Sequence, residues 1–109
     1  RIADVATLAA AQAKMLDRAA SVTRPGGRIV YCVCSLEPEE GEAQITALLR
    51  RNPDLERWPI EADEIGGLAE CVNEAGEVRT LPSHLPDADP RRSGLDGFFA
   101  ARLRRKAHR

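Results

Sequence analysis

The residues of this chain best suited to chemistry are Cys34 and Ser35, which several glutamates follow closely. A thiolate is a strong nucleophile, so an accessible cysteine can attack an electrophilic carbon and form a covalent intermediate. On residue type alone the alternative is an inert packing residue, because a cysteine that ends a buried strand behaves as a small apolar side chain. We expect that inert role for Cys32 and Cys71.

The same cysteines are poorly arranged for a metal site or for disulfides. Cys32 and Cys34 lack a second cysteine pair or a nearby histidine pair, and His84 and His108 lie far downstream. The cysteine count of three is odd, and no secretion signal is visible, which favours reduced thiols. We therefore expect no metal, no disulfide and a cytoplasmic location.

Composition narrows the class of protein further. The 109 residues carry a net charge of −1, with 43% hydrophobic and 30% charged residues, which is typical of a soluble globular domain or part of one. No apolar run approaches the roughly 20 residues that a membrane span needs, so no membrane role is expected. The basic run from Arg102 to Arg109 is expected to be a solvated chain end, with phosphate contact as the alternative. A first residue of Arg1 instead of Met suggests a piece of a longer polypeptide.

The elements that would hold Cys34 begin with a helix and a strand. Alanines and apolar residues at helical spacing predict an amphipathic helix from Ile2 to about Val22. Its expected inward face is Val5, Leu8, Ala9, Met15, Leu16, Ala19 and Ala20. After a turn at residues 25–27, the β-branched run Ile29–Val33 predicts a strand. Because this strand lacks polar alternation, we expect a parallel strand covered by helices on both faces, and hence an α/β fold.

A second helix is predicted to follow Cys34 directly. Pro38 suits the first helical position, glutamates suit the first turn, and Arg50 and Arg51 suit the last turn before a stop at Asn52-Pro53. The expected inward residues are Gly41, Gln44, Ile45, Leu48 and Leu49. Cys34 would then lie at the carboxyl end of a strand, which is where open α/β sheets bind ligands.

The second half of the chain carries weaker patterns. We predict short strands at Leu55–Ile60, Glu70–Val72, Val78–Leu81 and Gly97–Leu103 from their apolar and β-branched content. The segment Pro82–Gly94 is rich in proline and aspartate and is expected to be an exposed loop.

One segment resembles a known family closely. Residues 24–42 read Arg-Pro-Gly-Gly-Arg-Ile-Val-Tyr-Cys-Val-Cys-Ser-Leu-Glu-Pro-Glu-Glu-Gly-Glu. This segment resembles one block of the Sun/Fmu-type RNA (cytosine-5)-methyltransferases, the family that includes bacterial RsmB. The Pro-Gly-Gly turn is shared by many S-adenosylmethionine enzymes, whereas the continuation Tyr-x-x-Cys-Ser-x-x-x-Glu-Glu is specific. Arg79–Pro82 and Asp96–Leu103 resemble two further family blocks, so the resemblance covers nearly the whole chain.

The resemblance implies a fold and an activity. Residues 1–109 would be the C-terminal part of a Rossmann-type methyltransferase domain, with its last three strands, their flanking helices, and the final strand antiparallel between its predecessors. Cys34 would be the nucleophile that adds to carbon 6 of cytosine in RNA, which the family implies to be rRNA, with S-adenosylmethionine as methyl donor. The family's glycine-rich cofactor loop and its Asp-x-Pro-Cys segment are not in this chain. We therefore expect no cofactor-binding residues here and an isolated chain that is inactive.

Several expectations remain open at this point. Ser35, Arg79 and His84 are candidate RNA contacts, because they lie in or near the segments that could border an RNA groove. Val33 and Gly41 replace the threonine and asparagine usual in the family, and neither change is expected to affect the thiol much. Two alternatives to the cytosine-5 activity are a non-catalytic RNA-binding module and a Rossmann methyltransferase with another substrate. A truncated sheet would also expose a strand edge, which favours self-association.

Overall fold

The structure is a computed structural model that describes residues 2–80 and 97–107. The predicted loop Pro82–Gly94, with His84, lies outside these residues. The helices and strands are α1 (Ile2–Val22), β1 (Arg28–Val33), α2 (Glu42–Arg51), β2 (Leu55–Arg57), β3 (Val78–Thr80) and β4 (Phe98–Arg105). Three short 3₁₀ turns cover Pro38–Glu40, Ala62–Ile65 and Ala69–Cys71. The helix–strand–helix order predicted for the first half is confirmed.

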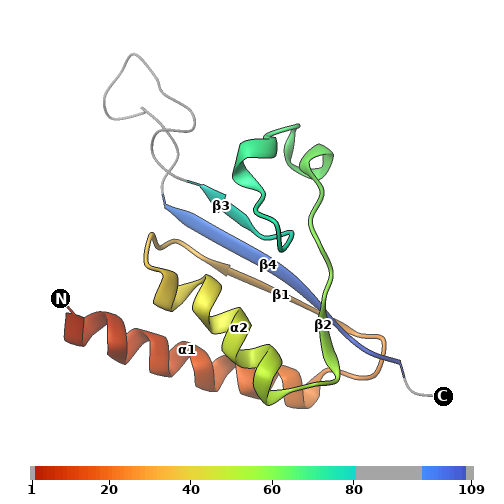
Figure 1. Ribbon diagram of the computed structural model, residues 1–109. Coiled ribbons are helices and arrows are strands. Elements are labelled where there is room, and N and C mark those ends of the chain that lie inside the picture. The colour runs from red at the N-terminus through yellow and green to blue at the C-terminus, as the bar shows by residue number, and fades with distance from the viewer. Residues whose placement is uncertain (1, 81–96, 108–109) are drawn as a thin grey trace.

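The sheet is built around its last strand, β4. On one edge β4 pairs antiparallel with the whole of β1, from Arg28 opposite Arg104 to Val33 opposite Phe99. On its other edge β4 pairs antiparallel with β2 and with the short β3. Figure 1 shows β4 as the long blue strand between these neighbours. The predicted insertion of an antiparallel final strand is confirmed. The short strand predicted at Val78–Leu81 is confirmed as β3, which makes the sheet four-stranded.

The main core lies between the sheet and the two helices. Alternate residues of β4 point into it, and both helices pack against the same face of the sheet (Figure 1). The buried members of this core are Leu16, Ala20, Ile29, Tyr31, Ile45, Leu48, Leu55, Phe99, Ala101 and Leu103. The residues between them on β1 and β4, which are both apolar and polar, point to the opposite face.

That opposite face is covered only in part by the residues that the structure describes. A smaller cluster of Cys71, Val78 and Ala100 covers the β3 side of β4. On β1, however, Val30 is 63% exposed and Cys32 is exposed as well. The prediction of a strand covered by helices on both faces is therefore wrong for the described residues, and the burial of β1 alternates along the strand.

The predicted inward face of α1 was too wide. Leu16 and Ala20 are buried, but Leu8 and Met15 are 51% and 66% exposed. At about 100° per residue, Leu8 and Met15 lie on one stripe that is turned by roughly 90° from Leu16 around the helix. The neighbours of α1 reach only the stripe that contains Leu16 and Ala20, so the second apolar stripe remains on the surface.

Two predictions for the second half are also wrong. Residues 70–72 do not form a strand: Ala69–Cys71 is a 3₁₀ turn, and Val72 makes one isolated bridge to Val78. The basic run is not a solvated end over its described part, because residues 102–105 lie in β4. Their ion-pair partners in the fold are Glu64 for Arg102, Glu56 for Arg104 and Asp54 for Arg105. Pairing with β1 and β2 orders the segment, which its charge alone would leave solvated.

Candidate functional site

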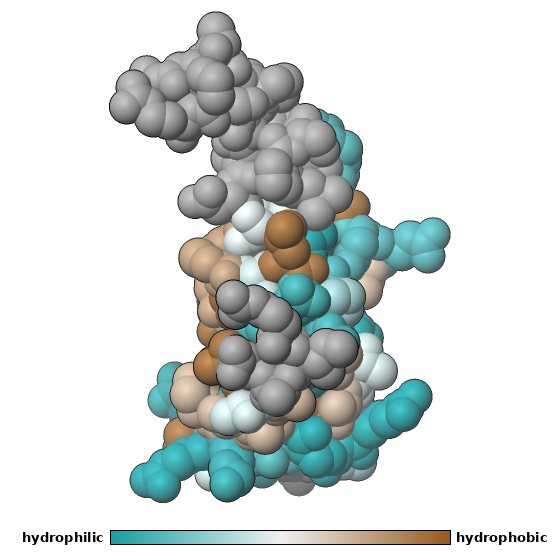
Figure 2. All heavy atoms as spheres, turned by 90° about the vertical axis from the view of Figure 1, so that its left-hand side faces the viewer, coloured by the Kyte–Doolittle hydropathy of each residue, from teal (hydrophilic) through white to brown (hydrophobic). Residues whose placement is uncertain are grey.

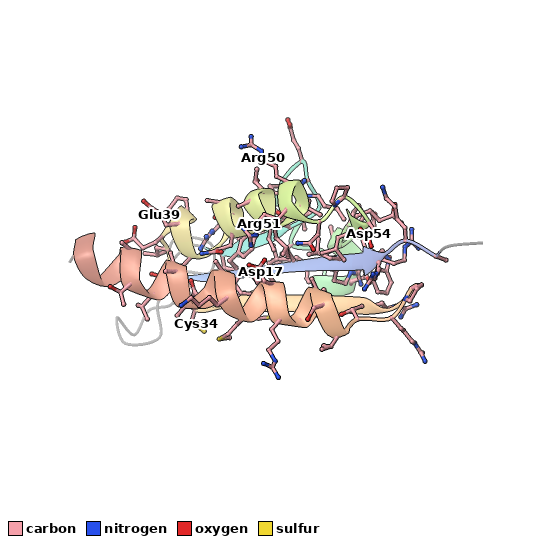
Figure 3. All side chains as sticks on the ribbon, turned by 90° about the horizontal axis from the view of Figure 1, so that it is seen from below. Asp17, Cys34, Glu39, Arg50, Arg51 and Asp54 are labelled. Carbon is pink, nitrogen blue, oxygen red and sulfur yellow. The ribbon has the colours of Figure 1, made fainter. Side chains whose placement is uncertain are left out.

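Cys34 lies immediately beyond the last residue of β1, and its side chain is exposed. Figure 3 shows Cys34 beside α1 and Arg50 on α2, at opposite edges of the pair of helices in this view. Its location at the carboxyl end of a strand agrees with the prediction. Exposure alone does not single out this thiol, because Cys32 is exposed too. What distinguishes Cys34 is the number of contacts that hold the chain directly after it.

The connection from Cys34 to α2 is a fixed turn. The Ser35 hydroxyl accepts a hydrogen bond from the Glu37 amide at 3.0 Å. Pro38 then begins a 3₁₀ turn, and the carbonyl of Glu40 at its end accepts a hydrogen bond of 2.7 Å from the buried hydroxyl of Tyr31. Burial raises the pKa of the Tyr31 hydroxyl above its ordinary value, and the nearby Glu40 carboxylate adds to the effect. Tyr31 therefore stays a hydrogen-bond donor and ties the turn to β1.

Gln44 connects the same turn to α1. Its side-chain amide donates to the Glu39 carbonyl at 3.1 Å and to the Ala9 carbonyl at 2.7 Å. Sequence reasoning placed Gln44 on the inward face of the helix but gave it no role. A polar residue at an inward helical position was the available signal, because a buried amide has to be hydrogen-bonded.

The second helix begins later than predicted. Pro38 initiates the short 3₁₀ turn, and α2 starts only at Glu42, after Gly41 with φ −127° and ψ −99°. A Cβ on Gly41 would lie 2.7 Å from the Arg79 Nη2 atom and 2.9 Å from the Phe99 ring. A side chain at position 41 would thus require Arg79 to move, which gives the glycine a packing reason.

Arg79 reaches this turn from β3. Its Nε donates to Glu42 Oε2 at 2.9 Å, its Nη2 donates to Glu42 Oε1 at 2.6 Å, and its Nη1 donates to the backbone carbonyl of Ser35. The Arg79 side chain is only 14% exposed. Two of the three candidate RNA contacts, Ser35 and Arg79, are thus brought together beside Cys34. His84 lies outside the described residues.

The bond to Arg79 makes Glu42 a sensitive point for pH. That hydrogen bond lowers the pKa of the Glu42 carboxyl below its ordinary value, against the opposing effect of burial. A carboxyl with a lowered folded pKa adds stability above its unfolded pKa and loses that contribution as pH falls through the folded pKa. We therefore expect Glu42→Gln to reduce the loss of stability that the wild type shows as the pH is lowered into the acidic range.

The thermal unfolding midpoints of the wild type and of Glu42→Gln, each measured at neutral and at acidic pH, would show this difference in acid sensitivity. Glu56→Gln is the matched control, because Glu56 also pairs with an arginine, Arg104, but both side chains of that pair are more than a third exposed. Equal acid sensitivity in the wild type and in both variants would show that the Glu42 pair contributes nothing to the pH dependence.

The glycine turn before β1 does not fit a cofactor loop. It precedes the strand, whereas the glycine-rich loop of a dinucleotide-type site follows one. Its amides are already used, since Gly26 N–H donates to the Arg105 carbonyl and Gly27 N–H to the Arg24 carbonyl, both at 2.8 Å. Within the described residues there is no cluster of three or more histidine, cysteine or acidic side chains able to hold a metal ion. No helix in this part of the chain is long and apolar enough to cross a membrane.

Comparisons with known proteins agree with this geometry. The model of the 16S rRNA methyltransferase RsmB/F family matches residues 1–104. Ribosomal RNA small subunit methyltransferase B of Thermus thermophilus is 40% identical over 102 residues, which are 94% of this chain and 22% of that protein. Methyltransferase F of Klebsiella pneumoniae is 35% identical over 92% of this chain and 19% of its own length.

A solved structure similar to this chain is also that of a methyltransferase homologue. A methyltransferase homologue from Pyrococcus horikoshii superposes with a TM-score of 0.68 at 28% identity, over 96% of this chain and 33% of that one. The chain thus spans about a fifth of the length of the curated relatives and a third of this structural neighbour. Its sheet is the C-terminal portion of a Rossmann-type methyltransferase fold. The chain belongs to the RsmB/F family of 16S rRNA methyltransferases.

Proposed function

We propose that the complete protein containing this chain is a cytoplasmic S-adenosylmethionine-dependent enzyme that methylates carbon 5 of a cytosine in rRNA. Residues 1–109 would form the C-terminal part of its catalytic domain. The family supports rRNA methylation in general. The observation that carries the finer proposal is the exposed thiol of Cys34 at the end of β1, followed by a turn that side chains from β1, α2 and β3 hold in place.

The chemistry of cytosine explains why a thiol is needed. Carbon 5 of cytosine is a poor nucleophile. When the Cys34 thiolate adds to carbon 6, the sulfur–carbon bond forms and the electrons of the 5,6 double bond make carbon 5 enamine-like. After carbon 5 has been methylated, loss of its proton to a base restores the double bond and expels the thiolate. The target base must leave its stack to reach Cys34.

The methyl donor would be bound outside this chain. S-adenosylmethionine supplies an electrophilic methyl group when bound. The turn at residues 24–27 does not fit it, because the Gly26 and Gly27 amides already donate to the carbonyls of Arg105 in β4 and of Arg24. We accordingly expect the isolated chain to be inactive and to bind the cofactor weakly or not at all.

The open edge of β1 and the exposed apolar side chains near it support the proposal that this chain is part of a larger domain. Among the described strands β1 pairs only with β4, so its other edge is open. Val30 and Met15 add exposed apolar side chains. Figure 2, which views the molecule from the end where α1 begins, shows apolar residues gathered down one side and hydrophilic residues on the other. An open edge with apolar neighbours would also promote self-association of the isolated chain.

The test is covalent trapping with RNA that contains 5-fluorocytosine. Fluorine at carbon 5 blocks the loss of a proton that would release the enzyme, so the adduct should persist. We expect the complete protein with S-adenosylmethionine to give an RNA adduct on the peptide that carries Cys34, as read by mass spectrometry. No adduct on RNA that the protein binds would instead favour a non-catalytic RNA-binding module, and would return Cys34 to the role of a packing residue.

A further inference from the structure

Arg79 joins three parts of the fold at the point where Cys34 is presented. Its guanidinium group holds both carboxylate oxygens of Glu42 at the start of α2 and also donates to the carbonyl of Ser35, the residue directly after Cys34. A guanidinium is planar and offers its donors in a rigid fork, so three simultaneous bonds fix it in position and orientation. The Ser35 peptide is thereby tied to both β3 and α2.

The support behind Arg79 is rigid as well. Arg79 is the middle residue of β3 and lies opposite Phe99 in the ladder with β4. Its guanidinium carbon lies 5.2 Å from the centre of the Phe99 ring, and Phe99 is fully buried. Gly41 leaves the space that the guanidinium needs. A group held by a strand, a buried ring and an ion pair can define the position of a neighbouring residue more precisely than a loop could.

The partly buried ion pair of Arg79 with Glu42 favours an internal role of Arg79 over contact with RNA. A side chain that contacts phosphate is expected to present its donors to solvent, but the Arg79 side chain is 14% exposed and donates from all three of its nitrogens within the chain. We infer that Arg79 is a positioning residue, which sets the location of the Cys34 thiol through the Ser35 carbonyl. The inference rests on the proposed function of Cys34.

The experiment measures the trapping rate and RNA affinity of the complete protein separately. At saturating 5-fluorocytosine RNA, Arg79→Ala should slow adduct formation by about 10- to 100-fold, because displacing a reacting atom by about 1 Å can have that effect. The dissociation constant for RNA should stay within about twofold of the wild type. Arg79→Lys should be intermediate, because one ammonium cannot hold Glu42 and Ser35 together.

Two further measurements separate positioning from a general loss of structure. Free guanidinium ion should restore part of the trapping rate of Arg79→Ala, since it can occupy the vacated space beside Glu42. Amide hydrogen exchange of residues 34–41 should become faster in that variant, while exchange in β1 stays unchanged. The matched control is Arg104→Ala, which removes an arginine from an exposed pair with Glu56 and should trap at the wild-type rate.

Results that contradict the positioning role of Arg79 can be told apart from results that contradict the proposed function. Trapping by Arg79→Ala at the wild-type rate overturns the positioning role and leaves the proposed function intact. A second outcome is weaker RNA binding by Arg79→Ala, with the slope of log affinity against log salt concentration reduced by about one and the trapping rate unchanged. That outcome would overturn the positioning role and identify Arg79 as a phosphate contact. If Arg79→Ala does not fold, the trapping rates of Arg79→Lys and Glu42→Gln test the positioning role in its place. A wild type that forms no adduct removes the proposed function, and the positioning role with it.

Discussion

Replacing Cys34 with alanine should lower kcat for methyl transfer by the complete protein by at least about 10⁴-fold, because the proposed bond to carbon 6 is formed by that thiol. RNA binding should be retained, since the thiol is exposed and its removal leaves the turn that follows it unchanged. The measurement is single-turnover transfer of a labelled methyl group to RNA, with the dissociation constant for RNA determined alongside.

The chain provides its own control for this experiment. Cys32→Ala removes a second exposed thiol, two positions earlier and within β1, and it should change the transfer rate by no more than about twofold. Loss of activity in Cys34→Ala alone would locate the chemistry at that sulfur. A Cys34→Ala enzyme that transfers methyl groups at the wild-type rate would remove the residue from the mechanism.

The largest effect on stability is expected from Phe99→Ala. Phe99 is fully buried near the start of β4, its ring meets the Tyr31 ring edge-on with centroids 6.3 Å apart, and it supports the guanidinium of Arg79. Truncating a buried phenylalanine leaves a cavity and destabilises by about 3–5 kcal/mol. The free energy of opening β1 and β4, measured by native-state hydrogen exchange on the complete protein, should fall by that amount.

Phe98→Ala is the matched comparison for this substitution. Phe98 is the preceding residue of β4, but it points to the opposite face, where it packs beside the smaller cluster and is only partly buried. Its truncation should therefore destabilise the sheet by less than the truncation of Phe99. Equal losses from the two variants would mean that the core on the helical side does not dominate the stability of this part of the protein.

Much of the local structure could be predicted from the sequence. The bounds of α1, the strand β1 and the end of α2 at Arg51 follow from helical spacing, a β-branched run and a proline stop, and all three are confirmed. These signals depend on residues that are near one another in the chain, so they do not require knowledge of the fold. The position of Cys34 at the end of a strand followed for the same reason.

Errors arose where burial depended on neighbours that local patterns do not specify. Leu8 and Met15 look like core residues by their spacing, yet no described element covers their stripe of α1. The basic residues of β4 look like a solvated end, yet pairing with β1 and β2 orders them and gives them acidic partners. In both cases the outcome depended on which distant elements pack beside the segment.

By itself the sequence determined the first helix and strand, the end of α2, the family and the candidate nucleophile, because these depend on short runs of neighbouring residues. Only the tertiary structure decided what surrounds Cys34. Arg79 is 37 positions from Glu42 and 44 from Ser35, and it reaches both because β3 and β1 lie on either side of β4. Contacts over such separations depend on the pairing order of strands, which no local periodicity encodes.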